Sequence, residues 1–388
     1  MGDIYTTREM LAKLVAFPTV SRDTNLPLIH FARDYLAGHG IESVLLPDPS
    51  GAPKANLYAQ IGPAEPGGVI LSGHTDVVPV DGQRWTSDPF TLTERGGRLY
   101  GRGAADMKGF DAIALALVPE MLRAGLKRPI QLALSFDEEL GCTGAPPMVD
   151  AMRANLPPAA AVFVGEPTSM TVVTQHKGML GLTTRVTGHE VHSSLLHTGV
   201  SAVMVAARLI DWHRQRMEEN AAAADPDSLF TPPYTTLHVG TVRGGTANNI
   251  TAGECVFGSD IRNLPGDDPE AWRARYRAFA DALEAEMKSV SAGAGIEIST
   301  RAIYGGCRRE PAETAVAEGM ARRLTGDNAE HVVSYGTEAG HFQDRGYSVC
   351  VVGPGSIEQA HQPDEFIEIA QLEAGEAFVR RLMAQLAA

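Results

Sequence analysis

The sequence predicts an α/β protein: a discontinuous main domain with a largely parallel sheet flanked by helices, plus an inserted α+β domain. Short apolar runs bounded by Gly and Pro occur at 68–72, 131–136, 160–164 and 347–352, and such runs are typical of strands buried on both faces. Up to residue 177 these runs alternate with helical patterns, which is the order of βαβ units. This pattern is interrupted after Lys177-Gly178 and returns near residue 306.

The main domain is therefore expected to comprise residues 1–177 and 306–388. In its first part, helical patterns cover 28–39 and 110–123, and a glycine follows each of them closely. In its second part, the pattern predicts helices at 313–324 and from 371 to the end, with a strand near 348 between them.

The insert, residues 178–305, has the order β-α-β-β-α-β, which predicts a split βαβ or ferredoxin-like sandwich. Asp268-Pro269 opens its second helix, in which an aromatic and apolar stripe recurs at helical spacing and indicates a core-facing side. The expected strands are 181–187, 236–242, 254–262 and 295–303, and the expected helices begin near 201 and 269.

Length and composition restrict the classes of function. A chain of 388 residues is long enough for two cores, and its formal charge of −14 includes no basic run, so we expect no nucleic-acid partner. No segment approaches the roughly 18 apolar residues of a membrane span, so we expect no membrane partner. Four scattered cysteines favour a reducing compartment, the cytoplasm, and argue against a thiolate metal site.

Polar side chains follow each of the four apolar runs. His74 and Asp76 follow the first run, Glu138 and Glu139 the second, Glu166 the third, and His361 lies beyond a Gly-Pro-Gly turn after the fourth. In open α/β sheets the ligand site lies beyond the carboxyl ends of the strands, so these side chains are expected to share one edge. Asp106 follows a Gly-rich approach and precedes a helix, where a carboxylate is often only a cap.

These residue types favour metal chemistry. A metal-bound His usually donates its second ring N–H to an oxygen, and Asp76 is placed to accept it from His74. Adjacent carboxylates such as Glu138 and Glu139 are costly to bury unless cations compensate, and one can bind metal while the other faces the reaction. Nitrogen and oxygen donors suit divalent zinc, cobalt or manganese.

The sequence resembles the M20 family of metallopeptidases and deacylases, and within it the acetylornithine deacetylase branch. The resemblance runs nearly end to end and rests on five ordered motifs: SGHTDVVP at 72–79, GRG at 101–103 with DMKG at 106–109, DEELG at 137–141, GEPT at 165–168, and GPG at 353–355 with HQPDE at 361–365. It implies two divalent metal ions, zinc or cobalt, and a cis peptide bond after Asp106.

The resemblance also implies a role for individual residues. Asp106 would bridge the two ions, with His74 and Glu166 on one and Glu139 and His361 on the other. Glu138 would be the general base and Asp76 would orient His74. The insert would be a lid and dimerisation domain, with His192 reaching the site of a neighbouring subunit in a homodimer. Substrate contacts would come from Asn249, Arg262, Gly336 and Thr337, although a surface salt bridge is the alternative for Arg262.

Three functions remain open from the sequence. The first is hydrolysis of a small N-acyl amino acid, above all deacetylation of N-acetylornithine in arginine biosynthesis, and the segment 355–361 favours it by resemblance. The second uses the same mechanism on other substrates, as a succinyl-diaminopimelate desuccinylase, another deacylase, a dipeptidase or a carboxypeptidase. The third is a metal-binding or assembly protein without catalysis, which the presence of Glu138, Asp76 and all five expected ligands disfavours.

Overall fold

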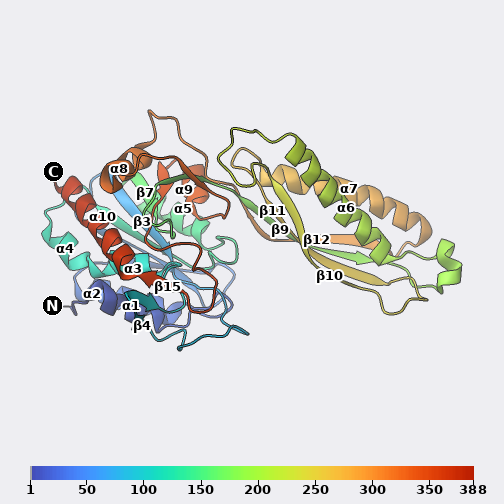
Figure 1. Cartoon of the computed structure of the whole chain (residues 1–388), viewed down its shortest axis with the longest axis horizontal. Helices are drawn as coiled ribbons and strands as arrows, with labels where there is room; N and C mark the ends of the chain where they lie inside the picture. The colour runs from blue at the N-terminus through green and yellow to red at the C-terminus, as the bar shows by residue number, and fades with distance from the viewer. Residues whose placement is uncertain (1) are drawn as a thin grey trace. The chain divides into compact units, whose positions relative to one another are not determined.

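The structure, a computed structural model, describes residues 2–388 and divides into two compact units (Figure 1). The larger unit comprises the chain up to Gln175, Arg308–His331 and Thr337–Ala388. The smaller unit comprises His176–Cys307 and Val332–Gly336. The chain therefore leaves the larger unit, builds the smaller one and returns.

An eight-stranded mixed sheet organises the larger unit, with the order β1-β2-β6-β3-β7-β14-β8-β13. At its centre β3 pairs in parallel with both β6 and β7, and β7 pairs in parallel with β14, whereas β1, β2 and β8 join antiparallel. The four apolar runs thus form four neighbouring strands, and the expected α/β class with a largely parallel central sheet is confirmed. The strands are β1 (Ser43–Pro47), β2 (Ala55–Ile61), β3 (Gly68–His74), β6 (Ile130–Ser135), β7 (Ala159–Val164), β8 (Val173–His176), β13 (His331–Val333) and β14 (Val349–Val351).

Helices flank this sheet and bury its apolar side chains. In Figure 1, α1, α3 and α10 lie side by side over it, and α1 and α10 both contact α3. Phe163 of β7 meets Phe378 of α10 edge to face, with ring centroids 5.3 Å apart. The helices are α1 (Thr7–Val15), α2 (Leu26–Gly38), α3 (Lys108–Ala116), α4 (Val118–Arg123), α5 (Ala145–Asn155), α8 (Val316–Thr325), α9 (Ala339–Asp344) and α10 (Ile369–Ala387).

The helix predicted over 110–123 is two helices, α3 and α4, so that prediction was wrong in one respect. Leu117 caps both helices, and Pro119 lies in the first turn of α4. A proline has no N–H to donate and its ring clashes with the carbonyl four residues earlier, so a continuous helix is interrupted there. The apolar periodicity runs across the break because both helices face the same core.

A small antiparallel sheet, β15-β5-β4, joins two loops that reach the candidate site. β15 (Phe366–Glu368) pairs with β5 (Arg98–Tyr100), and β4 (Thr93–Arg95) completes the sheet. Beyond this pairing the Gly101 N–H donates to the Glu365 carbonyl at 2.9 Å. The segment before Asp106 and the segment after His361 are therefore held against each other.

The smaller unit is an antiparallel sheet of order β10-β11-β9-β12 with two long helices. Its chain order, β9-α6-β10-β11-α7-β12, is the predicted split βαβ arrangement. Asp268 caps α7 by accepting the Glu270 N–H, and the predicted stripe packs inward, with Tyr276 fully buried. The elements are β9 (Met179–Thr187), a 3₁₀ turn η1 (Ser193–Thr198), α6 (Ala202–Ala222), β10 (Thr236–Gly244), β11 (Glu254–Arg262), α7 (Pro269–Val290) and β12 (Gly295–Tyr304).

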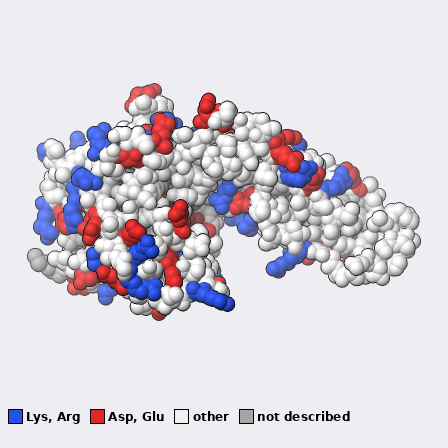
Figure 2. Space-filling view, in the orientation of Figure 1, with Lys and Arg blue, Asp and Glu red and all other residues white. Residues whose placement is uncertain are grey.

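Charges of both signs are interspersed on the face of the larger unit shown in Figure 2. Ion pairs at the surface of the larger unit include that of Arg8 with Glu94, at 3.5 Å. Among the described residues, no helix combines the length and apolar character needed to cross a membrane.

Candidate metal centre

The candidate site forms at the carboxyl ends of the four central strands. His74 is the last residue of β3, Glu138 and Glu139 follow β6, Glu166 follows β7, and His361 lies in the loop after β14. Gly165 permits this crowding, because a Cβ added there would lie 2.1 Å from the Phe110 ring. The chain thus brings side chains from widely separated segments to one edge of the sheet.

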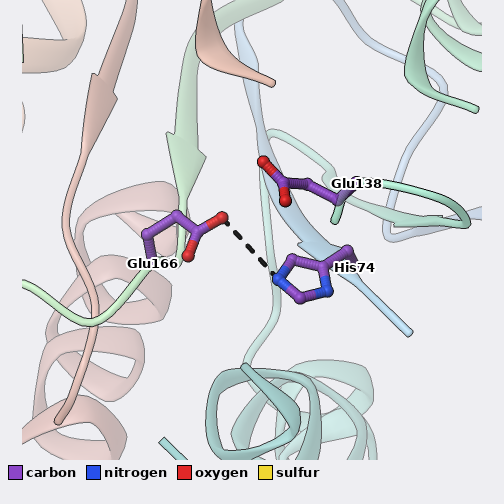
Figure 3. A group of neighbouring side chains, drawn as sticks. All are labelled: His74, Glu138 and Glu166. Atoms are coloured by element: carbon purple, nitrogen blue, oxygen red, sulfur yellow. Dashed lines mark ion pairs between the residues drawn. The ribbon is translucent and has the colours of Figure 1, made fainter. Parts of the chain in front are cut away.

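One half of the site is centred on His74. Its Nε2 lies 3.0 Å from Asp106 Oδ1 and 3.8 Å from Glu166 Oε1. Figure 3 shows the carboxylates of Glu138 and Glu166 turned toward the His74 ring. His74, Glu138 and Glu166 each offer a donor atom, all within 4.8 Å of one another. All three lie close enough to share one cation.

The other half is centred on His361. Its Nε2 lies 3.3 Å from Asp106 Oδ2 and 3.1 Å from Glu139 Oε2. The two oxygens of Asp106 therefore face different histidines, the arrangement that a carboxylate bridging two ions requires. His74 is buried, whereas half of the His361 side chain is exposed. A solvent path to the site on the His361 side follows from this difference.

Without cations, the carboxylates of the site are buried close together and repel one another. Burial, followed by repulsion from neighbouring acids, raises the pKa of Glu138 to about 8 and that of Glu139 to about 6. Burial and the nearby Asp106 also raise the pKa of Glu166 well above its usual value. Divalent cations would relieve this repulsion, because an opposite charge at close range favours the ionised carboxylate.

The histidines compensate part of this charge. Burial alone would lower the pKa of His74, but the hydrogen bond to Asp106 and the charge of Glu166 raise it well above its usual value. Hydrogen bonds to Asp106 and Glu139 raise the pKa of His361 to about 10. In return, these bonds outweigh burial and lower the pKa of Asp106. The histidines and carboxylates of the site therefore bind positive charge favourably, either as protons or as metal ions.

Asp76 contacts His74 differently from the sequence-based expectation. The His74 Nδ1 lies 2.9 Å from the Asp76 backbone carbonyl oxygen and 3.7 Å from the carboxylate Oδ1. The carboxylate accepts the Glu138 N–H at 3.2 Å and the Ser21 hydroxyl at 2.7 Å. Strand alternation brings both side chains to one side, but the chain turns after β3 and presents the carbonyl instead.

The loop 101–106 is fixed by a buried ion pair. Arg102 Nη1 donates to Glu365 Oε2 at 2.6 Å, and each of the two side chains is only 1% exposed. Glu365 also accepts backbone N–H groups from Gly103, Ala105 and Asp106. The peptide bond after Asp106 is cis, as the resemblance implied. The backbone that carries the bridging carboxylate is therefore held on several sides.

Three polar residues near the site were not identified as site residues from the sequence. The first, Glu338, is buried and accepts the hydroxyls of Ser72 and Ser135, at 2.5 and 2.7 Å. Lys54 donates to the buried Asp137 at 2.6 Å. The third, Gln83, donates to the His361 carbonyl at 2.9 Å. No local pattern marks Lys54 or Gln83, whereas Glu338 directly follows Gly336 and Thr337, which the resemblance implied as substrate contacts.

The remaining candidate residues lie mostly in the smaller unit. His192 and Asn249 are exposed there, and His192 Nδ1 lies 2.8 Å from the Ser194 hydroxyl. Arg262 donates to Asp260 at 2.9 Å, which is the ion pair that the sequence left open as its alternative role. Gly336 closes the short segment of this unit, and Thr337 follows in the larger unit, where its hydroxyl accepts the Ala339 N–H.

Relatives with curated names match nearly the whole chain. An acetylornithine deacetylase of Myxococcus xanthus is 37% identical over 97% of this chain and 96% of its own length. Another, from Proteus mirabilis (strain HI4320), is 35% identical over 97% of this chain and 95% of its own length. The match thus includes both units.

The fold is also found among solved structures. The M20 family metallo-carboxypeptidase Sso-CP2 of Sulfolobus solfataricus superimposes with a TM-score of 0.75 at 18% identity, covering 99% of this chain and 100% of the other. At that identity the likeness concerns the fold alone. Residues 70–385 match the profile of peptidase family M20/M25/M40. On this match and on the relatives, the chain belongs to peptidase family M20/M25/M40.

Proposed function

We propose that this protein is a metal-dependent amidohydrolase that deacetylates N-acetylornithine, giving ornithine and acetate. The observation that carries the proposal is the near full-length similarity to acetylornithine deacetylases, at 37% and 35% identity, in a chain whose carboxylates and histidines meet at one sheet edge. The small-molecule substrate, an N-acyl amino acid, follows from these relatives. Its use in arginine biosynthesis in the cytoplasm is part of the same proposal, and the four buried cysteines, none of which forms a disulfide, support a reducing compartment.

Two divalent ions are proposed to bind, with zinc as the first choice and cobalt as the alternative. His74, Asp106 and Glu166 would hold one ion, and Asp106, Glu139 and His361 the other. The distances of 3.0 and 3.3 Å from the two Asp106 oxygens to the two histidines support the bridging role. When bound, the ions would polarise the scissile carbonyl and make a water molecule easier to deprotonate.

Glu138 is proposed as the general base. Its carboxylate faces the His74 ring and has a donor atom within 4.8 Å of those of His74 and Glu166, a position from which it could take and return a proton. Glu138 would accept the proton of the attacking water while the new C–O bond forms. It would then deliver that proton to the amine nitrogen as the C–N bond breaks. Asp76 would orient the site by holding the backbone of Glu138 and, through its carbonyl, the His74 ring.

The smaller unit, which contains the insert expected at residues 178–305, is proposed to be a lid and dimerisation domain. His192 would stabilise the oxyanion in the site of a neighbouring subunit, and Asn249, Arg262, Gly336 and Thr337 would contact the substrate. Arg262 would have to exchange Asp260 for the substrate carboxylate, which it can bind with the same two-pronged geometry.

Exposed apolar side chains support a homodimer through this unit. Leu196 and Met204 are 59% and 66% exposed, and Leu195, Val242 and Ile250 are exposed as well. β10 is an edge strand of the sheet, and unpaired strand edges are ready to associate. Light scattering should give twice the chain mass for the wild type, and a lower mass for Met204→Glu if this surface forms the dimer.

A substrate panel tests the proposed reaction. Purified protein loaded with zinc or cobalt would be assayed against N-acetyl, N-formyl and N-succinyl amino acids, including N-acetylornithine and N-succinyl-diaminopimelate, and against dipeptides. The proposal expects the highest kcat/KM for N-acetylornithine. A higher kcat/KM for the succinyl substrate or for dipeptides would replace it with the corresponding desuccinylase or dipeptidase activity.

A further inference from the structure

Gln83 connects the buried hydrogen-bond network around Arg102 to the loop that carries His361. Its Oε1 accepts Arg102 Nη2–H at 2.6 Å and the Trp85 indole N–H at 3.0 Å, and its Nε2 donates to the His361 carbonyl at 2.9 Å. Arg and Trp side chains only donate hydrogen bonds. The amide therefore has one possible orientation, with its oxygen toward these two donors and its NH₂ group toward His361.

At one end of this connection, Arg102 is held by several contacts. Arg102 is fully buried, is paired with Glu365 at 2.6 Å, and has its guanidinium carbon 5.1 Å from the centre of the Trp85 ring. Glu365 in turn holds the Asp106 N–H at 3.1 Å. Gln83 is thus attached to the same network that fixes the bridging carboxylate.

At the other end, the backbone around His361 belongs to neither a helix nor a strand. His361 has a left-handed backbone conformation, with φ of 62°, and lies in a loop rather than on a strand. A second link between the loops runs from the Thr86 N–H and hydroxyl to Asp364 Oδ1, at 2.9 and 3.0 Å. By contrast, His74 belongs to the central strand β3, and its ring is fixed by the Asp76 carbonyl. The two halves of the site therefore depend on different restraints.

We infer that Gln83 is a positioning residue that holds His361 in place for the second metal, the one assigned to Asp106, Glu139 and His361. This inference rests on the proposed function, because it presupposes a two-metal site. Loss of the bond from Gln83 to the His361 carbonyl frees the loop without removing any ligand. The affinity for the second ion should fall, whereas the ion held by His74, Asp106 and Glu166 should bind as before.

Gln83→Glu isolates this bond. The variant keeps an acceptor for Arg102 and Trp85, but it replaces the NH₂ donor with a carboxylate oxygen that faces the His361 carbonyl. Gln83→Ala serves as a second variant that removes all three bonds. The matched control is Gln60→Glu, because Gln60 also donates its side-chain amide to a backbone carbonyl, that of Pro63 at 3.2 Å, in another loop of the larger unit.

The experiment is a titration of metal-free protein with Co²⁺, followed by visible absorbance and by calorimetry. Wild type and Gln60→Glu should bind two ions per chain with the same two affinities. In Gln83→Glu and Gln83→Ala one of the two affinities should stay within about twofold of wild type, and the other should fall about tenfold, at the lower end of the effect of groups that orient metal ligands.

The possible outcomes separate the two proposals. Unchanged affinities in both Gln83 variants, or an equal loss at both sites, would overturn the positioning role. Wild-type protein that binds fewer than two ions would instead contradict the proposed function, whatever the variants do. A turnover deficit of Gln83→Glu at limiting Co²⁺ that excess Co²⁺ abolishes would support the inference. A deficit that excess Co²⁺ leaves in place would count against it.

Discussion

Replacing Arg102 with methionine should destabilise the larger unit by about 3 kcal/mol. Removal of one partner of a buried ion pair typically costs about 3–5 kcal/mol, because the remaining charge is left without compensation. Arg102 and Glu365 are each 1% exposed, which places the pair in this class. Three backbone N–H groups still donate to Glu365 in the variant, so we expect the lower end of the range.

The loss should depend on pH in a defined direction. Burial raises the pKa of Glu365 even with Arg102 opposing it, and without Arg102 this pKa should rise further. An acid with a raised pKa in the folded state does not lower the free energy of unfolding at pH values below its unfolded pKa of about 4.3, because it is then protonated in both states. The cost then grows as pH rises toward the folded-state pKa. Arg102→Met should therefore lose less stability at pH 5 than at pH 8.

Urea unfolding of metal-free protein, followed by circular dichroism at both pH values, measures this effect. Arg98→Met is the matched control, because Arg98 pairs with Glu368 at 3.4 Å with both side chains about half exposed, and such pairs contribute less than about 1 kcal/mol. A loss for Arg102→Met that is the same at pH 5 and pH 8, or no larger than that of Arg98→Met, would refute the reasoning.

Three other predictions concern metal binding, the buried Asp111 and His192. Metal binding at pH 7.5 should release protons, because the pKa values of His74 and His361 are both raised in the metal-free site; calorimetry in buffers of different ionisation enthalpy should detect this, and binding without release would contradict it. Asp111→Asn should stabilise metal-free protein relative to wild type, by an amount that grows from pH 5 to pH 8. Burial raises the pKa of Asp111 to about 8, so its ionisation opposes folding in that range. A pH-independent difference in Tm would count against this. Mixing His192→Ala with Glu138→Gln under subunit exchange should restore part of the activity if His192 serves a neighbouring subunit, and no recovery despite proven exchange would exclude that role.

The sequence was sufficient to predict the four central strands of the large sheet and the elements of the insert. The apolar runs that became β3, β6, β7 and β14 were recognisable because strands buried on both faces consist almost wholly of apolar residues. The insert was recognisable from its order of elements. The polar residues after the four runs could then be grouped, because parallel strands end at the same edge.

Contacts between loops could not be predicted in the same way. Glu338 is 266 residues from Ser72, and Gln83 is 278 residues from His361, so no local spacing relates them. Their polar side chains also follow no helical or strand period. The sequence placed Asp76 beside His74 but did not show that its backbone carbonyl would be the nearer acceptor, because alternation along a strand gives the side of a residue, not the turn of the backbone after the strand ends.

The most direct measurement of the central claim is the kcat of Glu138→Gln for N-acetylornithine at matched metal content. Gln keeps the shape of the side chain but cannot take a proton from water. With metal content near that of wild type, by elemental analysis, kcat should fall at least about a hundredfold, the scale of general-base catalysis. The exposed substitution Glu42→Gln should leave kcat unchanged. Turnover by Glu138→Gln equal to that of wild type, at equal metal content, would contradict the account.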